Sequence, residues 1–290
     1  MDQNSQAVSK ITVPAILESK LRGEKVTCLT AYDYSTARLV DEAGIEMILV
    51  GDSLAQAILG YDSTVPVTVD EMLHHLKAVR RGVRRALLIA DMPYGAYHVS
   101  HEQALASAIR FLKEGGAEAV KLEGGRKRAR LVRELVEAQI PVMGHIGLTP
   151  QSVHALGGYQ VQGRTLDAAT ELLTDAEALE EAGAFAVVLE GIPRELAAII
   201  THRMRVPTIG IGAGPDCDGQ VLVFHDLVGL SYTPPAKFVR SYAKLRETLH
   251  QALVDFRADV GEGRYPDDRE SYHWTSAVRE QFEKESSRPA

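Results

Sequence analysis

The chain has 290 residues, of which 45% are hydrophobic and 24% charged, and its formal net charge is −7. This composition is that of an ordinary globular protein, and the negative charge argues against nucleic acid or an anionic membrane as the main partner. The polar N-terminus lacks the apolar centre of a secretory signal, and no apolar run approaches the length of about 20 residues that spans a bilayer. Cys28 and Cys217 show no metal-ligand or redox spacing. We therefore expect a cytoplasmic protein with reduced cysteines and no membrane partner.

The predicted elements run from an expected disordered segment, residues 1–10, to a charged tail, residues 261–290. Short apolar runs predict the strands, and capped amphipathic segments predict the helices. The predicted strands are residues 25–30, 47–50, 86–90, 119–122, 141–144, 186–189, 207–211 and 221–225. The predicted helices are residues 12–22, 35–42, 68–81, 100–113, 126–138, 168–182, 194–204 and 234–258.

Local signals support several of these boundaries. Pro14 stands in the first turn of the first helix, where its missing N–H is harmless. Thr68 and Glu71 have the spacing of a capping box. Residues 55–67 form a loop long enough to act as a lid or binding loop, and residues 146–165 form a long loop rich in glycine and polar residues.

Eight strands that alternate with helices predict parallel β/α units. A (β/α)₈ barrel needs about 250 residues. We place it as a single catalytic domain at residues 11–260, with an extra helix at its N-terminus. A doubly wound sheet is the alternative and would confine ligands to one switch point. Ionisable residues follow at least five of the strands here, so we favour the barrel.

These five ionisable residues are Asp52, Asp91, Glu123, His145 and Glu190. Asp52 follows the apolar run M-I-L-V and a glycine, a pattern typical of a strand buried on both faces. A carboxylate at the end of a buried strand is costly unless a metal, a cation or a substrate satisfies it. Because the active sites of barrels lie at the carboxyl ends of the strands, we interpret the five residues as one site.

Three of the carboxylates, Asp52, Asp91 and Glu123, predict a metal site. Oxygen ligands at separate strand ends suit a hard divalent ion, and Mg²⁺ takes one or two carboxylates together with water and substrate oxygens. The alternative is that each acid caps a helix or pairs with a surface arginine. For one acid alone, this alternative and the metal site are about equally well supported. For all three acids together, the alternative is much weaker.

The remaining candidates have distinct expected roles. Lys121 lies two residues before Glu123 on one strand, so both side chains point to the same face. Lys121 is a candidate for binding a substrate carboxylate or stabilising an enolate, or it forms a structural ion pair. Glu190, with no charged sequence neighbour, is the candidate general base. His145 is a substrate-binding candidate or a core histidine, and Ser53 is a candidate for binding a substrate carboxylate.

Two further motifs are weaker indicators of function. The sequence G-I-G-A-G at residues 210–214 is a weak dinucleotide signal, because Pro215 follows in place of the start of a helix. We interpret it as a tight loop that allows a ligand to approach closely. The pair His74 and His75 lies in a predicted helix without the context of a zinc motif, and we interpret it as structural.

A series of motifs resembles the ketopantoate hydroxymethyltransferase family, also called 3-methyl-2-oxobutanoate hydroxymethyltransferase. The resemblance is nearly continuous from Thr12 to about Leu230. Its motifs are T-A-Y-D at 30–33, V-G-D-S at 50–53, G-Y-D-S-T at 60–64, D-M-P at 91–93, V-K-L-E-G-G at 120–125, G-H-I-G-L-T-P-Q at 144–151, L-E-G-I-P at 189–193 and I-G-I-G-A-G at 209–214. Together and in this order, they leave little room for another family.

The resemblance implies a barrel of the phosphoenolpyruvate-mutase type that transfers a hydroxymethyl group from methylenetetrahydrofolate to 3-methyl-2-oxobutanoate. The product is 2-dehydropantoate, on the route to pantothenate and coenzyme A, and the reaction passes through a Mg²⁺-stabilised enolate. It also implies one Mg²⁺ per subunit, methylenetetrahydrofolate as co-substrate and a homo-oligomer, usually a decamer.

Carried over by motif, the metal ligands are Asp52, Asp91 and Glu123. Asp52, Ser53, Asp91 and Lys121 contact the 2-oxo acid, His145 matches the family's active-site histidine, and Glu190 is the proton acceptor.

Two other hypotheses remain at this point. One is a different Mg²⁺-dependent lyase or mutase of the same barrel superfamily that acts on a 2-oxo acid without folate. The other is a catalytically inactive barrel that serves as a binding protein, which the intact acids and Lys121 disfavour.

Overall fold

The computed structural model describes residues 9–287, which divide into two compact units, one up to Tyr242 and one from Ala243. The expected disorder of residues 1–10 falls mostly on residues outside this range. Lys10 lies within it, and its ammonium is 2.5 Å from Glu118. Among the described residues, no helix is both long and apolar enough to cross a membrane.

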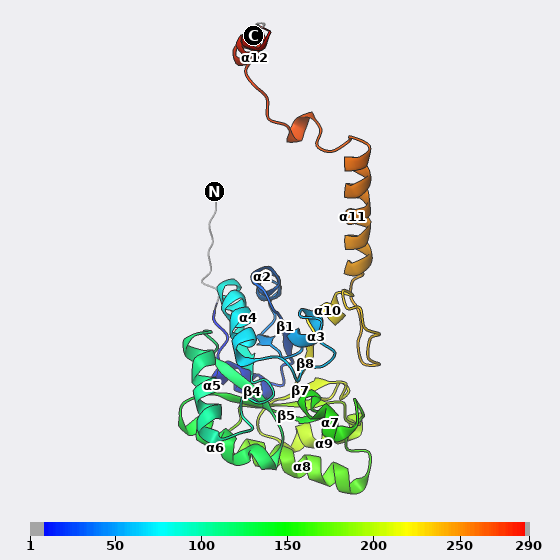
Figure 1. Ribbon diagram of the computed structural model, residues 1–290. Helices are drawn as coiled ribbons and strands as arrows, with labels where there is room; N and C mark the ends of the chain where they lie inside the picture. Colours follow the sequence, from blue (N-terminus) through cyan, green and yellow to red (C-terminus); the bar gives the residue numbers. More distant parts are fainter. Residues whose placement is uncertain (1–8, 288–290) are drawn as a thin grey trace. The chain divides into compact units, whose positions relative to one another are not determined.

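The first unit contains a closed barrel of eight parallel strands in chain order (Figure 1). Its strands are β1 (Val26–Thr30), β2 (Met47–Val50), β3 (Leu87–Asp91), β4 (Ala119–Glu123), β5 (Val142–Gly147), β6 (Ala186–Glu190), β7 (Thr208–Ile211) and β8 (Gly219–Leu222). β8 pairs with β1, from Val26 opposite Gly219 to Leu29 opposite Leu222, and this pairing closes the sheet. The barrel is confirmed, and the doubly wound alternative is wrong.

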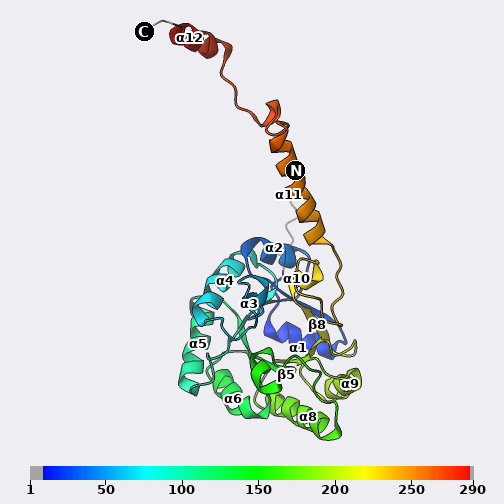
Figure 2. The ribbon, with the colours of Figure 1, turned by 45° about the vertical axis from the view of Figure 1, so that its right-hand side comes forward.

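Helices surround the barrel, and Figure 2 shows α2, α4, α5, α6, α8 and α9 following one another around the strands. The helices of this unit are α1 (Val13–Leu21), α2 (Tyr34–Glu42), α3 (Leu54–Ala57), α4 (Val69–Gly82), α5 (His101–Lys113), α6 (Ala129–Glu137), α7 (Val153–Leu156), α8 (Leu166–Glu181), α9 (Arg194–Arg203) and α10 (Phe224–Leu227). The predicted capping box of Thr68 and Glu71 starts α4, because each side chain accepts a hydrogen bond from the other's backbone N–H.

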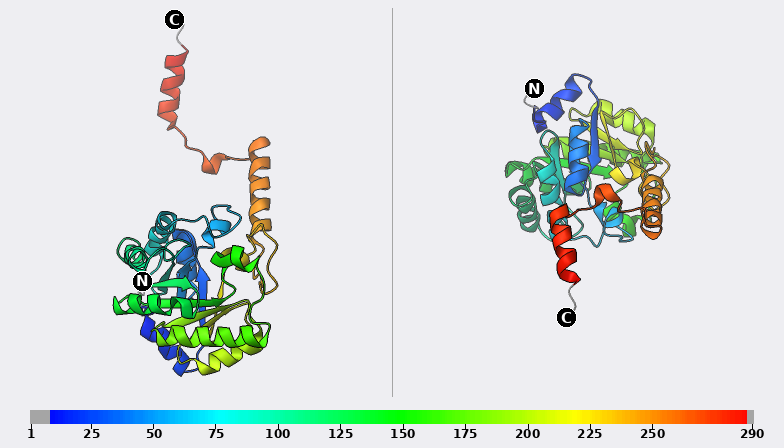
Figure 3. Two further views of the ribbon diagram at one scale, coloured as in Figure 1. Left: turned by 60° about the horizontal axis from the view of Figure 1, so that its bottom comes forward. Right: turned by 90° about the horizontal axis from the view of Figure 1, so that it is seen from above.

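The barrel interior is apolar toward the end where the strands begin. Ile16 of α1 belongs to this interior cluster, and Val13 and Leu17 pack against it. The extra N-terminal helix is therefore confirmed, and it closes the end of the barrel where the strands begin; Figure 3 shows it in dark blue from two further directions. The other buried members of the cluster are Val26, Cys28, Met47, Leu49, Leu87, Ile89, Ala119, Met143, Phe185, Ala186, Val188, Ile209 and Val221.

Several predicted boundaries are wrong for identifiable reasons. β5 continues to Gly147, because its pairing with β6 extends to Gly147 opposite Glu190, so His145 lies inside the strand and not after it. The last strand is Gly219–Leu222, because its register is set by β1, and Phe224 already begins α10. The loops at 55–67 and 146–165 contain short helical turns, including α3 and α7.

The predicted helix 234–258 begins only at Leu245, as α11 (Leu245–Gly261). Residues 241 and 242 are instead held by the segment of α10, because the Ser241 hydroxyl donates to the carbonyl of Asp226 and the Tyr242 N–H donates to the carbonyl of Leu227. α11 belongs to the second unit together with α12 (Ser276–Ser286). Both cysteines are free and buried, as the sequence predicts. The placement of a domain boundary at residue 260 stays a prediction.

Candidate active site

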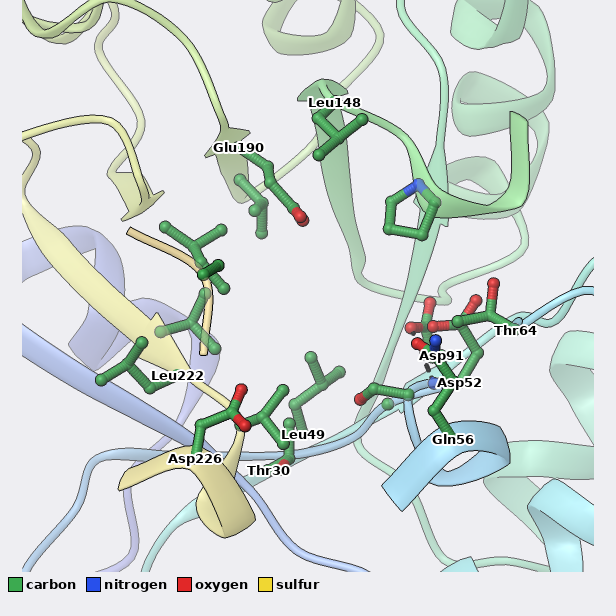
Figure 4. Close-up of a pocket in the computed structure, with 18 of the residues that line it drawn as sticks. Thr30, Leu49, Asp52, Gln56, Thr64, Asp91, Leu148, Glu190, Leu222 and Asp226 are labelled. Carbon is green, nitrogen blue, oxygen red and sulfur yellow. Dashed lines mark hydrogen bonds between the residues drawn. The ribbon is translucent and has the colours of Figure 1, made fainter. Parts of the chain in front are cut away.

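A cavity of about 430 Å³ lies where the strands end, and every candidate residue from the sequence lines it (Figure 4). These residues are Asp52, Ser53, Asp91, Lys121, Glu123, His145 and Glu190. The convergence follows from the barrel, because side chains at alternate positions of each strand point inward and the strand ends meet at one rim. A cavity of this size is in the usual range for a small-molecule site.

The β4 strand shows how the sequence builds this rim. Its residues 119, 121 and 123 share one face, so the apolar Ala119 lies in the interior below the polar Lys121 and Glu123. Register then sets their neighbours: Asp91 is opposite Lys121, and Glu123 is opposite His145. The strand pairing therefore places a cation, two acids and an imidazole in adjacent positions.

Lys121 and Asp91 form an ion pair in the barrel interior. The Nζ of Lys121 is 2.9 Å from the Oδ1 of Asp91, and both side chains are almost wholly buried. Burial by itself lowers the pKa of Lys121, but the carboxylates of Asp91, Glu123 and Asp52 outweigh it, so the pKa is raised and the ammonium stays charged. Burial raises the pKa of Asp91 to about 7, against the opposing effect of Lys121.

Gln151 holds two of the acids in place. Its Nε2 donates to the Oδ2 of Asp52 at 2.9 Å and to the carbonyl of Met92 at 3.0 Å, and its backbone N–H donates to the Oε2 of Glu123 at 3.1 Å. The hydroxyl of Tyr97 donates to the Oε1 of Gln151 at 2.6 Å and accepts from the backbone N–H of Glu123 at 3.2 Å. This buried network fixes which oxygen of each carboxylate faces the cavity.

His145 connects Lys121 with Glu190. Its Nδ1 is 3.3 Å from the Nζ of Lys121, and its Nε2 is 3.2 Å from the Oε2 of Glu190, although that contact is not an aligned hydrogen bond. An ammonium only donates, so Nδ1 must accept and the proton of the neutral imidazole is on Nε2, facing Glu190. Burial and then Lys121 lower the pKa of His145, which favours this neutral form. No signal in the sequence indicated that a histidine lies against Glu190.

Two backbone and hydroxyl contacts complete the site. The Oγ of Ser53 is 2.8 Å from the hydroxyl of Tyr32, and the backbone N–H of Asp52 donates to the Oδ2 of Asp91 at 3.1 Å. Gly147 has a φ of +95°, and a Cβ there would lie 2.2 Å from the carbonyl oxygen of Glu190. Only glycine allows the chain to pass this closely behind the candidate base.

The carboxylates also have the chemistry of a divalent-cation site. The Oε1 of Glu123 is buried without a hydrogen-bond partner, and the Oδ1 of Asp91 has the charge of Lys121 nearby but no aligned hydrogen bond. Within residues 9–287, no three His, Cys, Asp or Glu side chains are arranged as a ready-made metal group. Two adjacent acids, Asp52 and Asp91, nevertheless suit an ion that takes few protein ligands and keeps positions for substrate and water.

Sequence reasoning missed Tyr97, Gln151 and Asp226 as residues of this site or its support. Gln151 ends the motif G-H-I-G-L-T-P-Q, so the motif contained the signal although its role was not recognised. Tyr97 lies in the loop after β3 and carried no signal. Asp226 lies in α10, directly after the predicted strand 221–225, and it lines the cavity.

Comparison with known proteins decides the family. The sequence profile described as ketopantoate hydroxymethyltransferase matches residues 10–268. The chain belongs to the ketopantoate hydroxymethyltransferase family. This membership confirms the resemblance drawn from the motifs and makes the chain an enzyme, a hydroxymethyltransferase.

Individual relatives agree with the family assignment. The 3-methyl-2-oxobutanoate hydroxymethyltransferase of Koribacter versatilis is 63% identical over 265 residues, which cover 91% of this chain and 90% of that protein. The protein of the same name from Carboxydothermus hydrogenoformans is 53% identical over 275 residues, which cover 95% of this chain and all of that protein.

Solved structures support the fold. A phosphonopyruvate hydrolase complexed with oxalate and Mg²⁺ matches with a TM-score of 0.58 at 15% identity, covering 94% of this chain and 96% of that chain. A 2,3-dimethylmalate lyase of the phosphoenolpyruvate mutase and isocitrate lyase superfamily matches with a TM-score of 0.54 at 16% identity, covering 94% of this chain and 97% of that chain. These likenesses confirm the expected barrel type.

Proposed function

We propose that the enzyme transfers a hydroxymethyl group from methylenetetrahydrofolate to 3-methyl-2-oxobutanoate, forming 2-dehydropantoate for pantothenate and coenzyme A synthesis. The observation that carries this proposal is the juxtaposition of Lys121, Asp52 and Asp91 with Glu190 around one cavity. A 2-oxo acid needs a charged and polar pocket for its two oxygenated carbons and a base beside its C3–H, and this cavity supplies both.

The divalent ion is proposed to be Mg²⁺, one per subunit, held by Asp52 and Asp91 with Glu123 completing the site. Bound there, the ion would supply a Lewis acid that polarises the keto oxygen of the substrate. Gln151 and Tyr97 keep the carboxylates in one arrangement before the ion and the substrate arrive, so little reorganisation is needed on binding.

Lys121 and Ser53 are the proposed substrate-binding partners. The Lys121 ammonium is buried and donates hydrogen bonds only, so it is suited to a substrate carboxylate or to the negative charge that develops on the keto oxygen. Ser53 and the adjacent Asp52 both line the cavity. Tyr32 fixes the orientation of the Ser53 hydroxyl through their 2.8 Å contact.

Glu190 is the proposed general base. Its carboxylate reaches into the cavity from the end of β6 and remains partly accessible, with a side-chain exposure of 15%. It would remove the C3 proton, and the resulting carbanion would form a C–C bond with the one-carbon unit as formaldehyde, which hydrolysis of its two C–N bonds releases from the folate. Water then supplies the oxygen of the new hydroxyl group, and tetrahydrofolate is the leaving product. The neutral Nε2–H of His145 lies 3.2 Å from the Oε2 of Glu190 and, once the two groups align, would donate to that carboxylate and orient the base. The folate itself supplies the one-carbon unit.

The reaction has two halves that one experiment separates. Exchange of the C3 proton of 3-methyl-2-oxobutanoate in D₂O, followed by NMR with Mg²⁺ and with EDTA, tests enolisation without folate. Adding methylenetetrahydrofolate then tests transfer. Metal-dependent exchange followed by transfer is expected. Exchange without transfer would favour the lyase or mutase hypothesis, and absence of both would favour the inactive barrel. The decameric assembly and the cytoplasmic location implied by the resemblance stay predictions.

A further inference from the structure

The cavity continues beyond the residues that the 2-oxo acid requires. One side contains the acids and Lys121, and the other side is mainly apolar, lined by residues before and after α10. The apolar lining residues there are Leu222, Val223, Pro234, Pro235, Ala236 and Phe238, and Thr233 adds a hydroxyl. The acid substrate has few atoms, so a cavity of about 430 Å³ leaves room for part of a larger second substrate.

Asp226 is the only ionisable side chain among the described residues that line this apolar side. Figure 4 shows it across the cavity from Asp52 and Asp91, with its carboxylate turned toward the intervening space. Its position is fixed, because the Ser231 hydroxyl donates to its Oδ1 at 2.5 Å and α10 is anchored by the Phe224 N–H on Thr30 at 2.9 Å. An ionised carboxylate has about four acceptor sites, so the contact with Ser231 leaves capacity for a ligand.

We propose that Asp226 binds the aminopyrimidinone edge of the folate pterin, an inference that rests on the proposed function. That edge presents two parallel N–H donors, N3–H and the 2-amino group, which match the two oxygens of a carboxylate as an arginine fork does. The apolar residues around Asp226 suit the faces of the ring. With this edge held on the far wall, the side of the pterin that carries the one-carbon unit points toward Glu190 and the 2-oxo acid.

Paired ligands and variants test this recognition directly. Binding of tetrahydrofolate and of its 2-desamino analogue is measured by calorimetry for wild type, Asp226→Asn and Ser231→Ala, and the KM for methylenetetrahydrofolate is measured in parallel. Wild type should bind the 2-desamino analogue about 10- to 100-fold more weakly, as for a lost hydrogen bond to a charged group. Asp226→Asn should bind tetrahydrofolate about as weakly and should discriminate little between the ligands. Asp216→Asn, a change of a partly exposed acid, is the matched control.

If the wild type exchanges the C3 proton and transfers the hydroxymethyl group normally, three outcomes would overturn only the inference about Asp226. The first is unchanged ligand discrimination in Asp226→Asn. The second is the same loss in Asp216→Asn, which would assign the effect to the loss of any one negative charge; Ser231→Ala should lose less, because Asp226 itself remains. The third is a loss of folate-free C3 exchange in Asp226→Asn as large as its loss of transfer, which would assign the carboxylate to the 2-oxo acid or to the fold. Absence of exchange and transfer in the wild type would overturn the proposed function itself.

Discussion

The Nζ of Lys121 lies 2.9 Å from the Oδ1 of Asp91, across two neighbouring strands of the closed barrel. Both groups are buried in a site that also contains Asp52 and Glu123, so neither charge is solvated by bulk water. Removing one partner of such a pair leaves the other charge uncompensated. The acids of the site are therefore tolerated in the free protein because Lys121 is among them.

Lys121→Met should destabilise the metal-free protein by about 3–5 kcal/mol at a pH where Asp91 is ionised, because the mutation leaves a buried carboxylate unpaired. The free energy of unfolding from urea titration in EDTA measures this loss. The double variant Lys121→Met/Asp91→Asn should recover part of it, since the charge of Asp91 is then removed together with its partner. Losses that simply add in the double variant would show that the pair is not coupled.

Glu190→Gln should slow C3 proton exchange by about 10²- to 10⁴-fold, the usual contribution of a general base. The amide keeps the shape of the side chain but takes up no proton. Exchange is followed by NMR in D₂O with saturating Mg²⁺. Glu195→Gln on the exposed surface of α9 is the matched control and should exchange at the wild-type rate. Exchange that survives in Glu190→Gln would assign the base to another residue.

Gln151 is a positioning residue for the metal site. Gln151→Leu should weaken Mg²⁺ binding by about 10- to 100-fold, the range found when groups that orient metal ligands are lost. Asp52 and Tyr97 would lose their amide partners, as the contacts of 2.9 Å and 2.6 Å show. Calorimetry on the metal-free protein measures the affinity without reference to activity. Gln162→Leu, at a half-buried glutamine outside the metal site, should bind normally, and an equal effect in both variants would contradict the assignment.

For the buried acids Asp91 and Glu123, the stability of the folded protein should fall as the pH rises. Acids that are ion-paired in the folded state usually have the opposite effect. Burial raises the pKa of Asp91 from 3.8 to about 7 and raises that of Glu123, so the folded metal-free protein keeps protons that the unfolded chain releases. The stabilising contribution of these groups is greatest below pH 3.8 and is lost as the pH rises toward about 7.

Thermal unfolding between about pH 4 and pH 8 in EDTA should therefore show a contribution from Asp91 that falls as the pH rises, and this contribution should be absent in Asp91→Asn. Because Mg²⁺ competes with these protons, the stabilisation that it adds should grow over the same range. A wild type and an Asp91→Asn variant with identical pH profiles would contradict the expectation.

The barrel and most of the site were predictable because two short-range rules act together. The alternation of strands and helices predicts parallel β/α units, and the carboxyl ends of such strands meet at one rim. Lys121 and Glu123 could be placed on one inward face from their spacing alone. The motifs then identified the family, which the comparison confirmed.

The tertiary structure alone decided which groups contact one another across the rim. Gln151 reaches Asp52 over 99 positions of sequence, and His145 meets Glu190 because the pairing of β5 with β6 continues to Gly147. Asp226 enters the cavity because β8 takes its register from β1, so that the chain turns into α10 before residue 226. Such contacts depend on strand register and on loop paths between distant segments, and no local periodicity of the sequence records either of them.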